Sequence, residues 1–151
     1  MYSASKFKPA WWLTNPHLQT LAAKFIRRNN KLVTCTETLE LPDGDFIDLA
    51  WTEHPTKNNT KPIIVVLHGL EGSKDSHYAT GMLNALKNRG WIAVLMHFRG
   101  CSGKPNRQAN SYHSGDIRDI SYLTEQLVAR YHHCEFSIIG FSLGGNVLTQ
   151  Y

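Results

Sequence analysis

The chain has 151 residues, of which 42% are hydrophobic and 19% are charged, a balance that is typical of a globular domain and excludes a disordered protein. The formal net charge is +4, but the basic residues are scattered, so we expect no nucleic-acid partner. One short basic cluster, which we interpret as a solvated helix end, contains Lys24, Arg27, Arg28 and Lys31.

Cysteine and hydropathy patterns indicate the compartment. Cys35, Cys101 and Cys134 are odd in number and far apart, which favours reduced thiols in the cytoplasm. No secretory signal is recognisable at the N-terminus, and the longest apolar run, Trp91–Met96, is too short to cross a bilayer. The histidines follow no metal-site spacing, so we expect neither a metal nor an organic cofactor. The oligomeric state is left open.

An amphipathic helix is predicted near the N-terminus. Asn15 is its expected N-cap and Pro16 its first helical residue. The apolar stripe that follows leaves two interpretations open, contact with a membrane surface and docking on the chain's own domain, and we favour docking. The stripe consists of Leu18, Leu21, Ala22, Phe25 and Ile26.

Two strands come next. The stretches 31–41 and 45–52 are rich in β-formers and are separated by the turn Pro42-Asp43-Gly44, which predicts a hairpin. In the second stretch, Ile47, Leu49 and Trp51 alternate onto one face.

From residue 61 onward, buried strands alternate with amphipathic helices. The apolar runs 63–67, 91–96 and 136–140 predict strands covered on both faces, and helices are predicted around 79–86, 117–131 and from 143 onward. This order predicts an α/β fold with a mostly parallel, doubly wound sheet, to which the hairpin adds antiparallel strands at one edge.

A candidate nucleophile lies in the last of these units. Gly140-Phe141-Ser142-Leu143-Gly144 has the spacing G-x-S-x-G between a strand and a helix start, which is the context of a nucleophile elbow. Such a serine has strained backbone angles, and side chains at the flanking Gly140 and Gly144 would collide with the turn. The helix start also favours negative charge near Ser142.

A second loop complements the elbow. His68-Gly69-Leu70 opens a Gly-rich loop directly after the first buried strand, and loops at the carboxyl ends of parallel strands share one rim. We therefore expect the backbone N–H groups of Leu70 and Leu143 to form an oxyanion hole. The alternative is an ordinary turn in which His68 is a structural hydrogen-bonding group.

Two other kinds of site are tested and rejected. The stretch 98–105 contains Gly103-Lys104, but Phe98 replaces the first glycine of a phosphate-binding loop and Pro105 follows the lysine. No G-x-G-x-x-G follows a predicted strand, which argues against a dinucleotide site. Cys101 is expected to be a buried, inert thiol.

Five blocks together resemble one family. The stretches "NPHLQT", "HGLEGSKDSHYATGML", "HFRGCSGKPNR", "SYHSGDIRDI" and "GFSLGGN" are similar to the YheT-like branch of the α/β-hydrolase superfamily, the AB hydrolase 4 family of carboxylesterases. The resemblance implies an α/β-hydrolase fold, Ser142 as nucleophile, and small-molecule ester substrates such as short or medium acyl esters or acylglycerols.

The chain departs from this family after the elbow. In α/β-hydrolases an acid and then a histidine follow the serine, but none of the nine residues after Ser142 is Asp, Glu or His. We therefore expect an N-terminal portion with little or no activity of its own, made of an extension (1–31) and a partial hydrolase domain (32–151), whose strand 136–140 is an exposed edge. Two alternatives stay open, a substitute pair of Ser142 with His113, His68 or His97, and a non-catalytic module that binds a partner through that edge.

Overall fold

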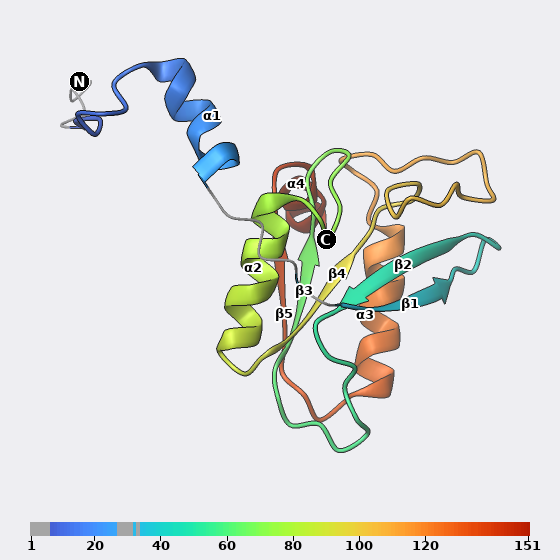
Figure 1. Ribbon diagram of the computed structural model, residues 1–151. Coiled ribbons are helices and arrows are strands. Elements are labelled where there is room, and N and C mark those ends of the chain that lie inside the picture. Colours follow the sequence, from blue (N-terminus) through green and yellow to red (C-terminus); the bar gives the residue numbers. More distant parts are fainter. Residues whose placement is uncertain (1–6, 27–31, 33) are drawn as a thin grey trace, which may run out of the picture.

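The computed structural model describes residues 7–26, 32 and 34–151. Within them, the apolar runs form strands and the amphipathic stretches form helices, as their periodicity predicts (Figure 1). In chain order the elements are α1 (Pro16–Ile26), β1 (Cys35–Glu40), β2 (Phe46–Trp51), β3 (Ile63–Leu67), α2 (His77–Asn88), β4 (Ile92–Met96), α3 (Arg118–Arg130), β5 (Phe136–Gly140) and α4 (Leu143–Gln150).

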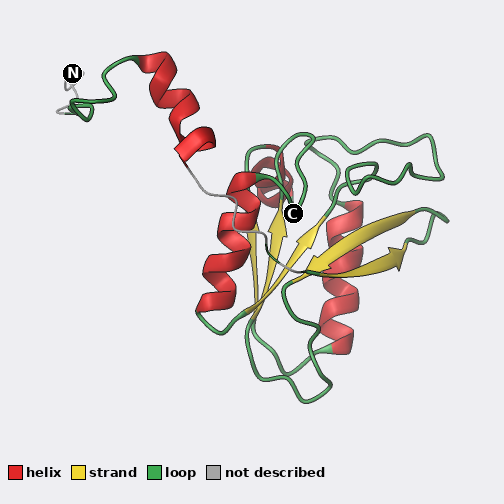
Figure 2. Cartoon of the chain, in the orientation of Figure 1, coloured by secondary structure: helices red, strands yellow, loops and turns green. Residues whose placement is uncertain are grey.

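The strands form one sheet with the order β1-β2-β4-β3-β5 (Figure 2). β3 lies between β4 and β5 and runs parallel to both. The β1-β2 hairpin is antiparallel and pairs with β4 on the other side of the sheet. The prediction of a parallel sheet with an antiparallel hairpin at one edge is therefore confirmed.

Helices cover both faces of the parallel strands, so alternate residues of a strand enter different cores. Ile64 and Val66 pack in one core with α2, whereas Val65 and Leu67 pack in the other with α3 and α4. In Figure 1, α2 and α3 accordingly lie on opposite sides of the sheet. Every residue of β3 and β4 is buried, which explains their uninterrupted apolar sequences.

Helix α1 begins where the sequence predicts it. Asn15 Oδ1 accepts hydrogen bonds from the N–H groups of His17 (2.9 Å) and Leu18 (3.3 Å), so Asn15 is the N-cap. The expected docking of the apolar stripe is wrong for Leu18 and Leu21, whose exposed fractions are 55% and 49%. Periodicity defines an apolar face but not the surface that covers it, and α1 lies apart from the sheet in Figure 1.

None of the helices in the described part of the chain, α1 included, is long and apolar enough to cross a membrane. Three residues of the expected basic cluster, Arg27, Arg28 and Lys31, lie outside the described residues.

Buried ion pairs connect the hairpin to the rest of the domain through Arg99, whose side chain is 4% exposed. Its Nε and Nη2 donate to the two carboxylate oxygens of Asp119 at 2.8 and 2.7 Å. Its Nη1 donates to Asp43 at 2.6 Å and to Asp45 at 3.2 Å. One guanidinium therefore joins the loop after β4, the hairpin turn and the first turn of α3. The two-nitrogen contact with Asp119 has the geometry that favours arginine over lysine.

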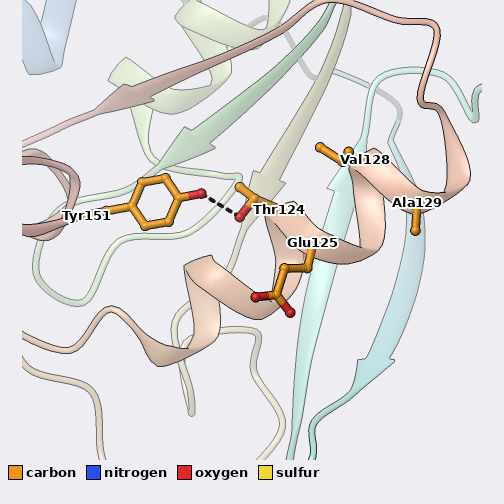
Figure 3. A pocket seen from close by; sticks show the side chains of 5 residues that line it. All are labelled: Thr124, Glu125, Val128, Ala129 and Tyr151. Carbon is orange, nitrogen blue, oxygen red and sulfur yellow. Dashed lines mark hydrogen bonds between the residues drawn. The ribbon is translucent and has the colours of Figure 1, made fainter.

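Strand β5 lies at an edge of the sheet, as predicted, and its outer side pairs with no described strand. A hollow of about 330 Å³ lies beside it, lined by residues of β5, α3 and α4. A second hollow, of about 390 Å³, lies between α3 and Tyr151, whose hydroxyl is 2.8 Å from Thr124 Oγ1 (Figure 3). Val128 and Tyr151 are 51% and 53% exposed at this edge.

The Arg99 contacts generate a stability prediction. Replacing Arg99 with alanine leaves the buried carboxylates of Asp45 and Asp119 without a cation, so we expect the free energy of unfolding to fall by about 3–5 kcal/mol. Lys61→Ala, which removes an exposed ion pair with Glu53, is the control and should cost about 0–1 kcal/mol. Urea unfolding measures both, and equal losses would contradict the assigned role of Arg99.

Candidate active site

Ser142 has the backbone strain that the elbow motif predicts. It lies between β5 and α4 with φ 51° and ψ −114°, a positive φ that is rare for a residue with a side chain. Such conformations persist only where the surrounding structure enforces them, and they are concentrated at functional sites. The strain makes Ser142 the leading candidate for a reacting group.

The two flanking glycines are required by close backbone contacts. A Cβ atom on Gly140 would lie 2.5 Å from the carbonyl oxygen of Gly144. A Cβ atom on Gly144 would lie 2.6 Å from the carbonyl oxygen of His68 and 2.7 Å from that of Leu67. The predicted collision is therefore present, and it involves β3 as well as the turn itself.

The pairing of β3 with β5 brings the Gly-rich loop next to the elbow. Leu67 is in register with Gly140, and the Phe141 N–H donates to the Leu67 carbonyl at 3.0 Å. A Cβ atom on Gly69 would lie only 3.3 Å from Ser142 Cβ. Between the loop and the elbow is a hollow of about 370 Å³, lined by Gly69, Leu70, Tyr78, Phe141 and Ser142.

Leu70 lines this hollow, and Leu143 directly follows its lining residue Ser142. The N–H groups of Leu70 and Leu143 donate to no acceptor among the described residues. Leu143 is the first residue of α4, where backbone N–H groups have no partner within the helix and the helix dipole favours a negative ligand atom. Both N–H groups therefore remain candidates for donors to a ligand.

His68 orients the loop rather than acting as a base. Its Nε2 accepts a hydrogen bond from the Phe98 N–H at 3.0 Å, and its Nδ1 is 2.6 Å from the Gly69 carbonyl oxygen. A carbonyl can only accept, so Nδ1 carries the hydrogen and the ring is neutral. Burial lowers the pKa of His68 to about 4, which keeps this form at neutral pH.

The other two histidines considered as substitute bases are also engaged elsewhere. His97 Nε2 accepts from the Lys74 N–H at 3.3 Å, and its Nδ1 lies 3.0 Å from the Asp48 carbonyl. His113 Nδ1 accepts from the Gly115 N–H at 3.2 Å. Within the described part of the chain, no side chain forms a hydrogen bond with the Ser142 hydroxyl. The structure thus does not assemble the substitute pair.

Asp116, within the "SYHSGDIRDI" block, has a structural role. Asp116 Oδ1 accepts from the Arg118 N–H at 3.1 Å at the start of α3, and its carboxylate forms an ion pair with the Arg118 side chain. The ion pair lowers the pKa of Asp116 to about 2. Asn146 of α4 donates to the Ser114 carbonyl at 3.2 Å, which connects this loop to the elbow helix.

Sequence reasoning missed two tyrosines that contact the Gly-rich loop. The Gly69 N–H donates to the Tyr78 hydroxyl and the Glu71 N–H donates to the Tyr112 hydroxyl, both at 2.9 Å. Tyr78 lies within the "HGLEGSKDSHYATGML" block, but no spacing rule marks either hydroxyl as a partner of the loop.

Comparison with known proteins gives one family and several relatives. Residues 62–151 match the family described as the alpha/beta hydrolase fold. "Putative esterase YheT" of Escherichia coli is 48% identical over 147 residues, which are 97% of this chain and 43% of that protein. "Phospholipase ABHD3" of Homo sapiens is 25% identical over 150 residues, 96% of this chain and 37% of that protein.

A solved structure gives the same result. An α/β serine hydrolase without a lid from Xanthomonas campestris superposes with a TM-score of 0.59 at 25% identity, over 78% of this chain and 56% of that one. The chain therefore spans roughly two fifths of the length of the curated relatives named above.

The glycine contacts can be tested directly. Gly144→Ala forces a Cβ atom against the backbone of β3, so we expect a loss of at least about 1–3 kcal/mol in the free energy of unfolding. Gly81→Ala is the matched control, because its Cβ would meet nothing within 4 Å on the exposed side of α2. There we expect a gain of about 0.5–1 kcal/mol from helix propensity. Equal effects of the two substitutions would refute the close approach.

The buried neutral ring of His68 predicts a pH dependence of stability. Its pKa is about 4 in the folded chain and about 6.5 when unfolded, so between these values the unfolded chain binds more protons. The free energy of unfolding should thus fall as the pH drops from about 6.5 to about 4, by on the order of 3 kcal/mol. His97, whose pKa is also lowered by burial, acts in the same direction.

Urea unfolding at about pH 7 and about pH 4.5 measures this dependence. His68→Asn should reduce the difference between the two pH values, whereas His132→Asn, at an exposed histidine, should leave it unchanged. A His68→Asn variant with the original pH dependence would show that another group is responsible.

Proposed function

Because this chain belongs to the α/β-hydrolase family, we propose that it carries the nucleophile and the oxyanion hole of a carboxylic ester hydrolase. Ser142 is the nucleophile, and the N–H groups of Leu70 and Leu143 bind the oxyanion. The observation that carries the proposal is the strained Ser142, which lines a hollow together with Leu70 and directly precedes the first residue of α4.

The reaction proceeds in two stages. Ser142 Oγ attacks the ester carbonyl carbon and gives up its proton to a general base, while the carbonyl π electrons move to the oxygen. The resulting oxyanion accepts hydrogen bonds from the Leu70 and Leu143 N–H groups. Collapse of this intermediate expels the alcohol, which takes up a proton, and leaves an acyl-serine. Water then adds to the acyl group, and a second collapse releases the carboxylic acid and regenerates Ser142.

His68 and His97 contact backbone groups with both ring nitrogens, and His113 does so with Nδ1; none of the three forms a hydrogen bond with Ser142. We therefore assign the base to a residue other than these three. The relatives named above are more than twice as long as this chain, which leaves room for such a residue in them.

The names of the relatives indicate the substrate class. One is called a putative esterase and another a phospholipase. We propose short or medium acyl esters or acylglycerols as substrates. The hollow of about 370 Å³ is small for a ligand site, which supports the smaller esters.

We also propose how the chain is divided and that it resides in the cytoplasm. We propose that residues 32–151 form the catalytic part, here without a base, and that residues 1–31 form an extension. Cys35, Cys101 and Cys134 are free thiols, which agrees with a reducing cytoplasm. Burial raises the pKa of the Cys101 thiol, which supports an inert thiol there.

A second candidate function rests on the edge of the sheet. The outer side of β5 pairs with no described strand, and the exposed Val128 and Tyr151 lie beside it. A non-catalytic module could bind a partner strand there by β-augmentation. In the full product of the gene, a fluorophosphonate probe separates the two candidates, since it labels only an activated serine.

Replacing Ser142 tests the proposed nucleophile. In the full product of the gene, Ser142→Ala should lower the hydrolysis of a simple aryl ester by at least about 10³-fold, because the acyl-serine cannot form. Ser137→Ala, at an exposed serine of β5, is the control and should keep full activity. Residues 1–151 by themselves should be labelled only slowly by the fluorophosphonate, because none of the described side chains accepts the Ser142 proton. Retained hydrolysis in Ser142→Ala would exclude this serine as the nucleophile.

A further inference from the structure

Hydrogen bonding in the Gly-rich loop is uneven in a way that singles out one N–H group. The Gly69 N–H donates to Tyr78, the Glu71 N–H to Tyr112, and the Gly72 N–H to the Gly69 carbonyl at 3.0 Å. Between them, the Leu70 N–H has no acceptor among the described residues. Every N–H from 69 to 72 thus donates within the domain except that of Leu70, which lines the hollow beside Ser142.

The peptide group between Gly69 and Leu70, which carries the Leu70 N–H, is held in place through its carbonyl oxygen. This oxygen, which belongs to Gly69, accepts hydrogen bonds from both His68 Nδ1 and the Gly72 N–H. In a trans peptide the carbonyl and the N–H point in opposite directions, so a fixed carbonyl fixes the direction of the N–H. The Tyr78 and Tyr112 hydroxyls hold the residues on either side of this peptide.

Both tyrosine rings are themselves fixed by aromatic packing. The Tyr78 ring lies 4.9 Å from the ring of Phe141, the neighbour of Ser142. The Tyr112 ring stacks on Phe98 with centroids 5.0 Å apart and planes 13° apart. Phe98 in turn donates its N–H to His68. The two hydroxyls therefore sit on rings that are anchored to the elbow and to the His68 contact.

Two residues of the loop, Gly72 and Glu71, are constrained next to these tyrosines. A Cβ atom on Gly72 would lie 2.5 Å from the Tyr78 hydroxyl oxygen and 3.0 Å from His68 Nδ1. Glu71 adopts a φ of 50°, which is costly for a residue with a side chain and needs enforcement by its surroundings. The Glu71 N–H bond to Tyr112 supplies such a constraint.

We propose that Tyr78 and Tyr112 are positioning residues of the oxyanion hole, which bind the N–H groups of Gly69 and Glu71 and leave the Leu70 N–H directed at the substrate oxygen. The proposal rests on the proposed ester hydrolase function. Neither hydroxyl forms a hydrogen bond with Ser142. In this proposal they act by holding a donor in place before the charge develops, which is when preorganisation is effective.

Two single substitutions and a control test the proposal in the full product of the gene. Tyr78→Phe and Tyr112→Phe keep the rings and remove only the hydroxyls, so each should lower kcat for an aryl ester roughly tenfold with little change in KM, because the lost contact matters mainly in the transition state. Tyr122→Phe is the control, since the Tyr122 hydroxyl bonds to no described residue and its ring packs against the core. It should retain the original kcat.

Amide hydrogen exchange in the 151-residue chain gives a second readout that needs no catalysis. Tyr78→Phe should accelerate exchange at Gly69, and Tyr112→Phe at Glu71, each by roughly tenfold, while Tyr122→Phe should change neither. A general loss of structure would instead accelerate exchange throughout the sheet. The site-specific pattern therefore distinguishes positioning from mere support of the fold.

The possible results separate this proposal from the one on which it rests. If Ser142→Ala abolishes hydrolysis but both tyrosine variants keep the original kcat, the positioning role is wrong and the nucleophile stands. If exchange at Gly69 and Glu71 is unchanged in the variants, the positioning role is wrong whatever the activity. If Ser142→Ala retains hydrolysis while exchange responds as expected, the ester hydrolase function fails and the tyrosines are confirmed only as anchors of the loop.

Discussion

The close approach of α4 to strands β3 and β5 is the constraint on which the candidate site depends. Gly144 lies against the carbonyl oxygens of Leu67 and His68, and Gly140 lies against the backbone of Gly144. With side chains at these two positions, α4 would have to move away from β3, and Ser142 would move with it. The strained φ of Ser142, the free N–H of Leu143 and the nearness of the Gly-rich loop all follow from this one contact between backbones.

Much of this arrangement could be predicted from the sequence, because it depends on short-range rules. Continuous apolar runs such as Ile63–Leu67 indicate strands with both faces covered, and the carboxyl ends of parallel strands share one rim. The spacing Gly140-x-Ser142-x-Gly144 further specifies a tight turn. These features fix which loops meet, and the structure brings them together at one hollow.

What the sequence could not provide are contacts between distant residues. The Tyr112 hydroxyl accepts a hydrogen bond from the N–H of Glu71, which is 41 residues away in the sequence, and no periodicity connects the two residues. The neutral form and tautomer of the His68 ring also depend on a partner 30 residues away. The Phe98 N–H donates to Nε2, the only nitrogen of this ring that can accept. For Leu18 and Leu21, periodicity correctly predicts a helix, but it carries no information on whether another surface covers them.

The buried carboxylates of the described residues are engaged in ion pairs. Buried carboxylates are expensive unless paired, and here each is used to hold a loop: Asp45 and Asp119 bind Arg99, and Asp48 binds Lys104. None of these three is free to orient a histidine. If Ser142 acts as proposed, the described residues supply the electrostatic part of catalysis, and proton transfer belongs to other residues. The two contributions are separable in other serine hydrolases, where the oxyanion hole and binding alone retain about 10³–10⁴-fold acceleration. If Leu70 and Leu143 form the oxyanion hole as proposed, an anionic ligand that resembles the intermediate binds at this hollow without a base, whereas turnover needs a base as well.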